Sequence, residues 1–495
     1  MSTTYAENLA LLDTLVEHTD AFVDGAFAPA SSGATLDSVS PRDGRVVARV
    51  ADCDERDVDR AVAAARAAFE GGRWWSQAPR ARKAVLQRLA RLVERDAGTL
   101  ALLESLDMGK PVADARAVDV RVSVETLDYY AEAIDKLYDE VAPTSPDVLA
   151  TITREPIGVV AAVVPWNFPL MLAMWKIAPA LAAGNSIVVK PAEESSLTLL
   201  KLAALASEAG LPDGVLNVVP GRGEVTGRAL GLHPDVDAVT FTGSGEVGRL
   251  FLDYAARSNL KQVSLELGGK SPQLVMADAP DTAEVAAAVA GGIFFNAGEV
   301  CSAGSRLLVH ASRAEELVEA VVAESRRFRA GDPLDPTTTL GALVSAEHLA
   351  RVTSYVDGAV AEGAEQRTAG TGTPDLPGYY LEPTVLTGVT PAMRVAQEEV
   401  FGPVLSVLTF DTVEEAVAIA NGTPYGLAAS VWTRDLSTAH RTARALRAGT
   451  VSVNCYDAAD VTVPFGGYKQ SGFGRDKSLH ALEKYTQLKT TWVRL

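Results

Sequence analysis

The chain has 495 residues, of which 47% are hydrophobic and 22% are charged, and this composition predicts a globular protein of two or three domains rather than a disordered or collagen-like chain. Its 45 basic and 63 acidic residues give a formal net charge of −18. Because duplex binding needs a basic face that displaces counterions, the charge balance argues against nucleic acid as a partner.

The amino terminus and the cysteines bear on the cellular location of the protein. No Lys or Arg precedes Arg42, so the positively charged region of a signal peptide is missing. The longest apolar run, residues 159–166, is less than half of the roughly 18 residues that span a bilayer. Three cysteines cannot form a disulfide framework in so long a chain, and no CxxC or HxxxH pair offers metal ligands. We therefore predict a cytoplasmic protein with no membrane partner and no structural metal.

Residues 1–150 are predicted to be mainly helical. Asp54 is the expected N-cap of a helix that closes at Gly71 and Gly72. In residues 82–106 apolar side chains recur at intervals of three and four positions, which predicts a second helix with one apolar face.

From Gly158 onward the hydrophobic pattern changes. Helical stretches that end at Gly184, Gly210 and Gly231 alternate with short β-branched runs, and these runs are residues 159–164, 187–190, 215–219, 238–241 and 263–267. Short buried strands separated by crossover helices form a parallel, doubly wound α/β sheet that binds ligands at the carboxyl ends of its strands. The sequence therefore predicts a Rossmann-like cofactor domain.

A second alternating series runs from Arg306 to Cys455. Its predicted strands are residues 307–310, 404–410, 427–432 and 451–454, and its predicted helices are residues 315–328, 413–420 and 437–446. This pattern indicates a second α/β domain. Two strand-like segments, residues 149–154 and 489–495, belong to neither series. Strand edges of this kind are usually covered, and we expect another subunit to cover them here.

A glycine-rich turn follows the fourth run of the first series. Gly243, Gly245 and Gly248 have GxGxxG spacing between a predicted strand and a predicted helix, where backbone amides can approach a phosphate. The same turn can also join strand to helix without any ligand. Glu266 lies 18 residues after Gly248, which a simple Rossmann pattern assigns to the ribose. Because Glu266 ends a strand and precedes Gly268, it is also a candidate base, or a solvated carboxylate.

Cys301 is a candidate nucleophile because it lies among small residues, in GEVCSAG, that leave room for a substrate. The alternative is a small buried hydrophobic residue. A Cys–His hydrolase is disfavoured, since none of the six histidines lies in a comparable glycine-rich loop. Phosphoryl transfer is also disfavoured, because the GGKS sequence lacks the glycine of a P-loop at Ser264.

Two further motifs place polar residues at strand ends. In PWNFP the two prolines fix a turn that holds Asn167 at the cleft, where its amide can donate to an oxyanion or bond its own turn. Lys190 and Glu193, in VVKPAEE, end the second strand, where doubly wound sheets bind the adenosine ribose. Solvated charges at a strand end are the alternative.

Together these motifs resemble the aldehyde dehydrogenase superfamily along nearly the whole chain. Seven of them occur in order, and they are PWNFP, KPAE, FTGSGEVG, LELGGKSP, GEVCSAG, EEVFGPV and PFGGYKQSG. The carboxyl-terminal stretch of residues 464–492 is most similar to γ-glutamyl-γ-aminobutyraldehyde dehydrogenases and related amino-aldehyde enzymes.

The resemblance implies an oxidoreductase that uses NAD. Cys301 attacks the aldehyde, while Asn167 and the Cys301 amide hold the oxyanion, and Glu266 activates the water that hydrolyses the thioester. Lys176 and Asp476 relay protons, although many members carry Glu at the latter position. The residues that the resemblance assigns to the cofactor are Trp166, Lys190, Glu193, Gly243, Ser244, Gly248, Leu267, Glu399 and Phe401. Those assigned to the substrate are Phe168, Trp175, Asp457, Asp460 and Phe465.

The resemblance also implies a domain plan. Residues 1–133 and 155–265 form the NAD-binding domain, and residues 266–464 form the catalytic domain. Residues 134–154 and 479–495 form a bridging sheet that joins subunits into homodimers or homotetramers. Glu299 departs from the family, where Gln is common, and a second acid near the nucleophile would tend to raise the pKa of the Cys301 thiol.

Alternatives remain at this point. A relative that passes the acyl group to coenzyme A is disfavoured by Glu266, because transfer to a thiol needs no such base. A non-catalytic relative and an enzyme with broad specificity for aliphatic or aromatic aldehydes are further options. The loop of residues 454–463 carries Asp457 and Asp460 beside small alanines, which predicts attraction of ω-amino aldehydes. A solvated acidic loop is the alternative.

Overall fold

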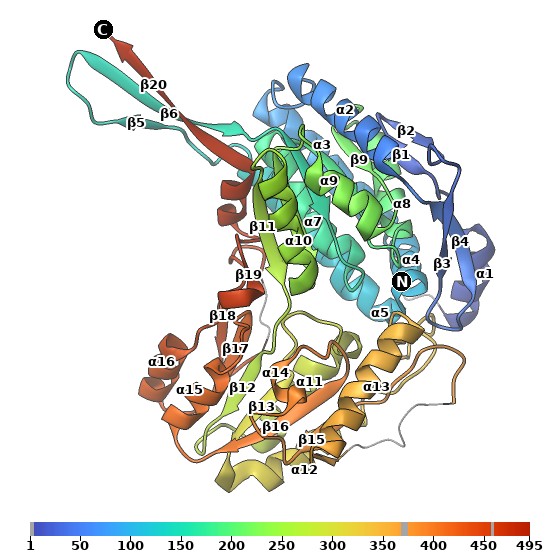
Figure 1. The fold of residues 1–495 in the computed structure, drawn as a ribbon, viewed down its shortest axis with the longest axis vertical. Coiled ribbons are helices and arrows are strands. Elements are labelled where there is room, and N and C mark those ends of the chain that lie inside the picture. Colours follow the sequence, from blue (N-terminus) through green and yellow to red (C-terminus); the bar gives the residue numbers. More distant parts are fainter. Residues whose placement is uncertain (1–3, 368–374, 457–459) are drawn as a thin grey trace.

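The computed structural model describes residues 4–367, 375–456 and 460–495. Figure 1 shows two α/β bodies, one built mainly from the first half of the chain and one from residues after about 270, with a thin three-stranded arm that projects from the first. This mixed α/β architecture confirms the predicted fold class. Among the described residues, no helix combines the length and the apolarity needed to cross a bilayer.

The first sheet has eight strands in the order β19-β11-β10-β7-β8-β9-β1-β2. Its five central strands are parallel and confirm the five predicted runs, and they are β7 (Val159–Val163), β8 (Ser186–Lys190), β9 (Leu216–Val218), β10 (Ala238–Gly243) and β11 (Gln262–Leu267). The chain builds the sheet outward from β7 through β8 to β9 and then crosses back to add β10 and β11 on the other side of β7. A ligand crevice therefore opens at the carboxyl ends of β7 and β10.

Helices connect these strands. They are α7 (Pro169–Ala183), α8 (Leu197–Glu208), the π-helical turn η2 (Gly223–Gly227), α9 (Arg228–Leu232) and α10 (Gly245–Arg257). Gly184 ends α7 with a left-handed φ of 102°, as glycine permits. The expected helix end at Gly231 is wrong, since Gly231 lies inside α9 and the helix ends one residue later.

The amino-terminal region is less helical than the sequence suggests. Four short strands precede the first long helix, and they are β1 (Ala21–Val23), β2 (Ala26–Ala28), β3 (Thr35–Val39) and β4 (Val46–Ala51). β1 pairs antiparallel with β9 of the first sheet, while β3 pairs with β4. Strands this short have little local periodicity and depend on their partners, which explains why the prediction missed them.

The helices of this region are α1 (Tyr5–Leu15), α2 (Glu55–Glu70), α3 (Pro79–Arg95), α4 (Ala97–Met108), α5 (Val112–Asp114), η1 (Ala115–Val120) and α6 (Arg121–Ala133). Asp54 caps α2, as predicted, by accepting from the Arg56 amide. The single helix expected over residues 82–106 is wrong, because the chain leaves helical geometry at Asp96 and begins α4.

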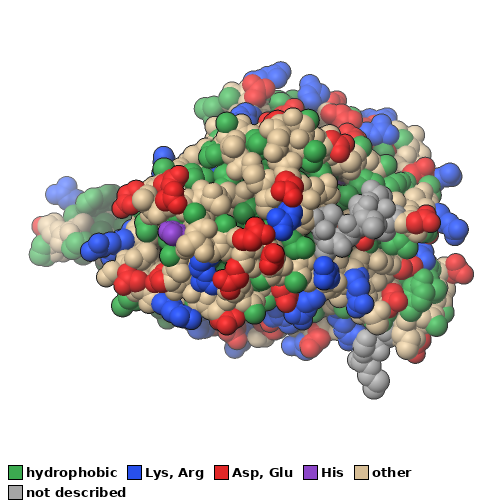
Figure 2. Space-filling view, turned by 90° about the horizontal axis from the view of Figure 1, so that it is seen from below, with side chains coloured by type: hydrophobic (Ala, Val, Ile, Leu, Met, Phe, Trp, Pro, Cys, Tyr) green, Lys and Arg blue, Asp and Glu red, His purple; other side chains and the backbone are tan. Residues whose placement is uncertain are grey.

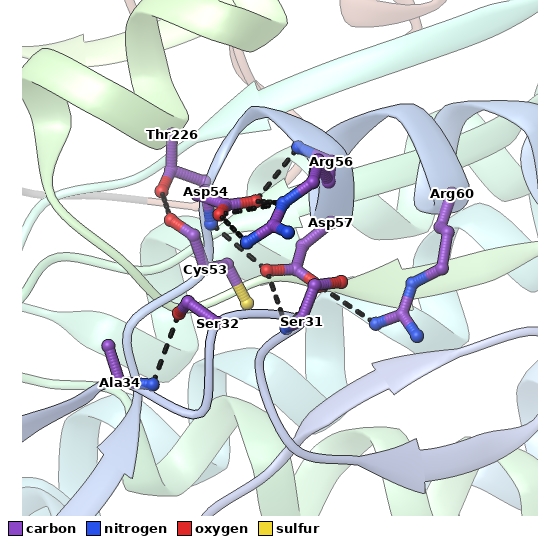
Figure 3. A network of polar contacts seen from close by, with 9 residues as sticks. All are labelled: Ser31, Ser32, Ala34, Cys53, Asp54, Arg56, Asp57, Arg60 and Thr226. Carbon is purple, nitrogen blue, oxygen red and sulfur yellow. Dashed lines mark hydrogen bonds and ion pairs between the residues drawn. The ribbon is translucent and has the colours of Figure 1, made fainter.

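Figure 3 shows the polar network at the start of α2, in which Cys53 lies. The buried Asp57 carboxylate accepts from the Ser31 amide and hydroxyl and from the Asp54 amide, while the Thr226 hydroxyl donates to the Cys53 carbonyl. Burial raises the pKa of the Cys53 thiol. Cys53 is thus a buried structural residue.

The second sheet has seven strands in the order β14-β15-β16-β13-β12-β17-β18. Its strands are β12 (Pro272–Val275), β13 (Arg306–His310), β14 (Glu365–Gln366), β15 (Thr384–Thr387), β16 (Val404–Phe410), β17 (Ala428–Trp432) and β18 (Thr450–Val453). Its helices are α11 (Thr282–Phe294), η3 (Phe295–Gly298), η4 (Ala311–Arg313), α12 (Ala314–Ser325), α13 (Ala346–Ala361), α14 (Arg394–Gln397), α15 (Val413–Asn421) and α16 (Leu436–Ala445). The four predicted strands and three predicted helices are confirmed, whereas β12, β15, α11 and α13 were not predicted.

The arm consists of β5 (Glu140–Ala142), β6 (Val148–Pro156) and β20 (Thr486–Arg494), all antiparallel. The two orphan strand segments therefore pair with each other, as expected. Between the second sheet and β20 the chain returns to the first sheet through η5 (Lys469–Ser471), β19 (Gly472–Phe473) and η6 (Leu479–Tyr485).

Candidate active site

A cavity of about 370 Å³ opens where the two α/β bodies meet. One wall consists of the carboxyl ends of β7, β10 and β11, which is where the doubly wound pattern places a ligand. The opposite wall comes from the second body. The lining residues used below are Trp166, Asn167, Thr242, Gly243, Ser244, Glu266, Leu267, Cys301, His348, Arg351, Glu399 and Phe401.

Asn167 is held against the chain segment that leads to Cys301. Its side chain is buried, and Nδ2 donates to the Glu299 carbonyl at 2.8 Å. The alternative in which Asn167 bonds its own turn is therefore wrong. Asn296 reinforces the contact, since its Nδ2 donates at 3.2 Å both to the Asn167 carbonyl and to the Glu299 carbonyl.

The turn before Cys301 is strained, and no local sequence pattern predicts this strain. Asn296 and Ala297 have φ values of 49° and 52°, in the left-handed region that non-glycine residues rarely adopt. Gly298 follows with φ of 72° and packs so closely that a Cβ would lie 2.1 Å from the Gly402 carbonyl. Strain of this kind persists only where surrounding contacts impose it. Here those contacts aim the Cys301 segment into the cavity.

The Glu299 side chain turns away from this segment. Its Oε1 accepts from the Val344 amide at 3.0 Å and lies 3.6 Å from His348 Nε2. Burial raises the pKa of Glu299 well above its ordinary value, so the neutral acid is favoured. The expected second negative charge beside Cys301 therefore has no support in the structure.

Glu266 is the residue before the last of β11, lines the cavity and is 4% exposed. Its Oε1 has no hydrogen-bond partner among the described residues. Burial raises the pKa of Glu266 to about 8, and Asp476 raises it further, while Lys176, Lys484 and Arg475 oppose the shift. A carboxyl whose pKa lies near neutral pH suits a general base. The solvated alternative for Glu266 is wrong.

Lys176 and Asp476, which were predicted as a pair, are brought together behind Glu266. Lys176 on α7 donates to Asp476 Oδ2, and Lys484 on η6 donates to Asp476 Oδ1. Although burial alone would raise it, the two lysines lower the pKa of Asp476 below its ordinary value. Lys484 was not predicted, because nothing in its local sequence indicates that it reaches so far into the protein.

The glycine-rich turn leads from β10 into α10, as expected. Ser244 is the N-cap of α10, and its hydroxyl accepts from the Val247 amide at 3.2 Å. Gly248 lies against Leu267, where a Cβ would come within 2.8 Å of the leucine side chain. Gly248 therefore serves close helix–strand packing, while Gly243 and Ser244 line the cavity.

The predicted ribose ligands lie beside the cavity rather than in its wall. Lys190 Nζ donates to Glu193 Oε2 at 3.1 Å, and Glu193 Oε1 accepts from the Gly223 amide. The neighbouring Glu194 lines the cavity instead. Burial raises the pKa of Glu194, with Glu193 adding to the shift.

Trp166, Glu399 and Phe401 also line the cavity. The Trp166 and Phe401 rings are edge to face, with centroids 5.3 Å apart. Glu399 Oε1 accepts from the Gly269 amide at 3.0 Å, and burial raises the pKa of Glu399 to about 7. His348 Nε2 contacts the Phe401 carbonyl at 2.7 Å.

Sequence reasoning missed the residues that α13 and the turn before it contribute to the cavity. They are Val344, Ser345, Glu347, His348 and Arg351. Burial lowers the pKa of His348 to about 4, so its ring is neutral near pH 7. The signal that could have found them is the Ser345 N-cap before an amphipathic helix.

The three aromatic residues among the predicted substrate residues form a cluster beside Cys301. Phe168, Trp175 and Phe465 are buried together, and Cys301 packs against them. The Trp175 and Phe465 rings have centroids 5.4 Å apart. Asp457 lies outside the described residues. Asp460 is exposed, and its Oδ1 accepts from the Thr462 amide and hydroxyl.

Within the described ranges no group of three or more His, Cys, Asp or Glu side chains could hold a metal ion. On the face shown in Figure 2, acidic and basic side chains are interspersed without a continuous basic patch.

Comparisons with known proteins show which family the chain resembles in sequence and in structure. A sequence model described as the aldehyde dehydrogenase family matches residues 27–491. The chain is 53% identical to aminoacetaldehyde dehydrogenase of Pseudomonas aeruginosa, covering 98% of each sequence, and 50% identical to the NADP/NAD-dependent aldehyde dehydrogenase PuuC of Escherichia coli, covering 96% of this chain and 95% of the relative. Its structure is similar to that of indole-3-acetaldehyde dehydrogenase AldA of P. syringae with NAD+ and IAA, with a TM-score of 0.98, 54% identity and full coverage of both chains.

Proposed function

The chain belongs to the aldehyde dehydrogenase family, and we propose that it oxidises an aldehyde to the carboxylic acid through a thioester on Cys301. The protein is an NAD-dependent enzyme. The observation that carries the assignment of residues is one cavity in which Cys301, Asn167 and Glu266 meet the carboxyl ends of a doubly wound sheet. The experiments that test it are the two variants that open the Discussion.

The residues present fit NAD. The amino terminus of α10 directs backbone amides toward the cavity beside Gly243 and Ser244, as phosphate binding requires. The Thr242 hydroxyl, buried in the same wall, has no partner among the described residues. Trp166, Ser244, Glu399 and Phe401 would hold the dinucleotide, with Lys190 and Glu193 at the adenosine ribose. The chemistry that bound NAD supplies is acceptance of a hydride.

Cys301 and Asn167 carry the first half-reaction. The Cys301 thiolate forms a C–S bond with the aldehyde carbon, and the carbonyl electron pair moves to oxygen. An amide nitrogen carries two N–H donors, and Asn167 uses one for the Glu299 carbonyl. The second, with the Cys301 backbone amide, stabilises the oxyanion. Loss of the substrate hydride then leaves a thioester on Cys301.

Glu266 carries the second half-reaction. Its carboxylate takes a proton from water, the hydroxide adds to the thioester carbon, and the C–S bond breaks to release the acid and the Cys301 thiolate. Water must lose a proton to attack the thioester, whereas transfer to the thiol of coenzyme A needs no such base. The position of Glu266 in the cavity wall therefore favours water as the acyl acceptor.

We expect kcat/KM with NAD to exceed that with NADP by about tenfold or more, because the Glu193 carboxylate repels a 2′-phosphate. Replacing Glu193 by serine should lower the ratio of kcat/KM with NAD to kcat/KM with NADP. Glu70→Ser, at the exposed last residue of α2, is the control and should leave the ratio unchanged. Steady-state kinetics with both cofactors measure the effect. Equal kcat/KM for the two cofactors in the unmodified protein would refute the assignment of Glu193.

We propose ω-amino aldehydes such as γ-aminobutyraldehyde, or its γ-glutamyl derivative, as the preferred substrates. The support is the pair of acidic residues Asp457 and Asp460 in the sequence, which the resemblance assigns to the aldehyde, and the likeness to aminoacetaldehyde dehydrogenase. Asp457→Asn and Asp460→Asn should raise KM for the amino aldehyde up to about tenfold and leave hexanal almost unaffected. Asp13→Asn on α1 is the matched control.

A second candidate substrate class is aromatic aldehydes. The observation that favours it is the buried cluster of Phe168, Trp175 and Phe465 beside Cys301, together with the likeness to indole-3-acetaldehyde dehydrogenase. A native preference for benzaldehyde or hexanal, or parallel KM changes for both substrate types in the aspartate variants, would exclude the amino-aldehyde proposal.

The arm supports assembly into a homodimer or homotetramer. Leu488, Trp492 and Val493 on β20 are exposed, with Trp492 at 66%. Apolar side chains on an exposed strand favour pairing with a second subunit. We also propose the domain boundaries derived from the resemblance, with residues 134–154 and 479–495 as the bridging segments, and a cytoplasmic location.

A further inference from the structure

Three charged side chains form a buried group behind Glu266. Lys176 comes from α7, Asp476 from the segment after β19 and Lys484 from η6. Their side chains are 1%, 1% and 11% exposed. Each oxygen of the Asp476 carboxylate accepts from one ammonium group. With two ammonium groups and one carboxylate, the group carries a net charge of +1.

Glu266 lies between this group and the active-site cavity. It lines the cavity on one side and, on the other, a narrow recess that it shares with Lys176, Asp476 and Lys484. The recess is too narrow to admit a water molecule. A water-mediated proton path from Glu266 to Asp476 would need this recess to widen, whereas the electric field of the charged group acts without such a path.

We propose that Lys176, Asp476 and Lys484 act as a fixed set of charges that adjusts the protonation of Glu266, and that Lys484 is a positioning residue for this set. Asp476 then stays ionised throughout the reaction and does not relay protons. The proposal rests on the proposed function of Glu266 as the base.

Two physical arguments support a fixed set. A relay acid must gain a proton in each cycle, but an Asp476 proton would disrupt two buried ion pairs at once and leave two ammonium groups uncompensated. Glu266, in contrast, is buried with Oε1 unpartnered among the described residues, so its ionisation responds strongly to nearby charge.

The charged groups that face Glu266 come from several elements. Lys176, Lys484 and Arg475 favour its ionised form, and Asp476 opposes it. Glu399 and Cys301 line the same cavity as Glu266. Without Lys484 the set would be neutral, and burial would hold Glu266 protonated over more of the working pH range.

The test is a set of variants that change the net charge of the three side chains. Lys484→Met leaves a net charge of 0, Lys484→Arg keeps +1, Asp476→Asn gives +2, and the double variant Asp476→Asn/Lys484→Met returns to +1. The readout is the acid limb of the thioester hydrolysis rate against pH, measured after a burst of NADH. We expect the limb to move up by about one pH unit in Lys484→Met and down by a similar amount in Asp476→Asn. It should stay near the wild-type position in the Lys484→Arg and double variants.

A relay through Asp476 predicts a different pattern. Both Asp476 variants would then hydrolyse the thioester slowly at every pH, without opposite movements of the limb, and this result would overturn the proposal. Infrared titration of the Glu266 carboxyl band in the protein without NAD, taken as wild type minus Glu266→Gln, reads the same shifts without catalysis. This titration tests the proposal in any variant that is folded but inactive. If the pKa read from the Glu266 band is the same in every variant, the three charges do not control Glu266 and the proposal is wrong.

The same experiment separates this inference from the proposed function. The NADH burst in each variant reports whether Cys301 is acylated. An acid limb that persists in Glu266→Gln would show that Glu266 is not the base, which would refute the proposed function. The infrared shifts would still show whether the three charges control Glu266.

Discussion

Replacing Cys301 by alanine is expected to lower kcat/KM for aldehyde oxidation by about 10⁴-fold or more, because the variant cannot form the covalent intermediate. Cys301 is the cysteine that lines the cavity with Asn167 and Glu266. Stopped-flow absorbance should show no NADH burst with any aldehyde. NAD should still bind, since the residues at the α10 amino terminus are unchanged.

Cys455→Ala is the matched control for this variant. Cys455 is only partly buried, and it is not among the cavity-lining residues. Its replacement should leave the burst and kcat within about twofold of the unmodified enzyme, as expected for a substitution outside the reacting groups. Residual turnover in Cys301→Ala, or loss of turnover in Cys455→Ala alone, would mean that the nucleophile has been misassigned.

Replacing Glu266 by glutamine is expected to leave the burst and to stop the enzyme after one turnover. Gln has nearly the same shape as Glu but cannot take a proton from water, so the thioester should persist while kcat falls about 10²- to 10⁴-fold. The burst should approach one NADH per active site. Intact-mass measurement should detect the acyl group on Cys301.

The pH dependence of the unmodified enzyme follows from the same residue. Because the pKa of Glu266 is raised to about 8, the carboxylate form that acts as a base is present above that pH and is lost below it. Thioester hydrolysis should therefore slow as the pH falls through this range, and Glu266→Gln should abolish this pH dependence.

If Glu266→Gln instead loses the burst and binds NAD weakly, Glu266 is a ribose ligand. Formation of acyl-coenzyme A by the unmodified enzyme, when coenzyme A is added with the aldehyde and NAD, would favour the acyl-transfer alternative.

The sequence by itself determined the α/β class, the five central strands of the first sheet and the candidate reactive residues. Buried parallel strands are short, continuous apolar runs bounded by glycine, so β7, β8 and β10 are visible without any tertiary information. The motifs around Cys301 and Glu266 are equally local, because each places a candidate reactive side chain on a turn or strand end beside glycines.

Only the tertiary structure decided which residues meet across the chain. β1 depends on pairing with β9, and His348 reaches the cavity because α13 docks beside Phe401. Lys484 joins Lys176 from a helix more than 300 residues away in sequence. Such contacts have no periodicity or turn chemistry that a local pattern could reveal. Their energy comes from burial and charge pairing, which exist only once distant segments have packed together.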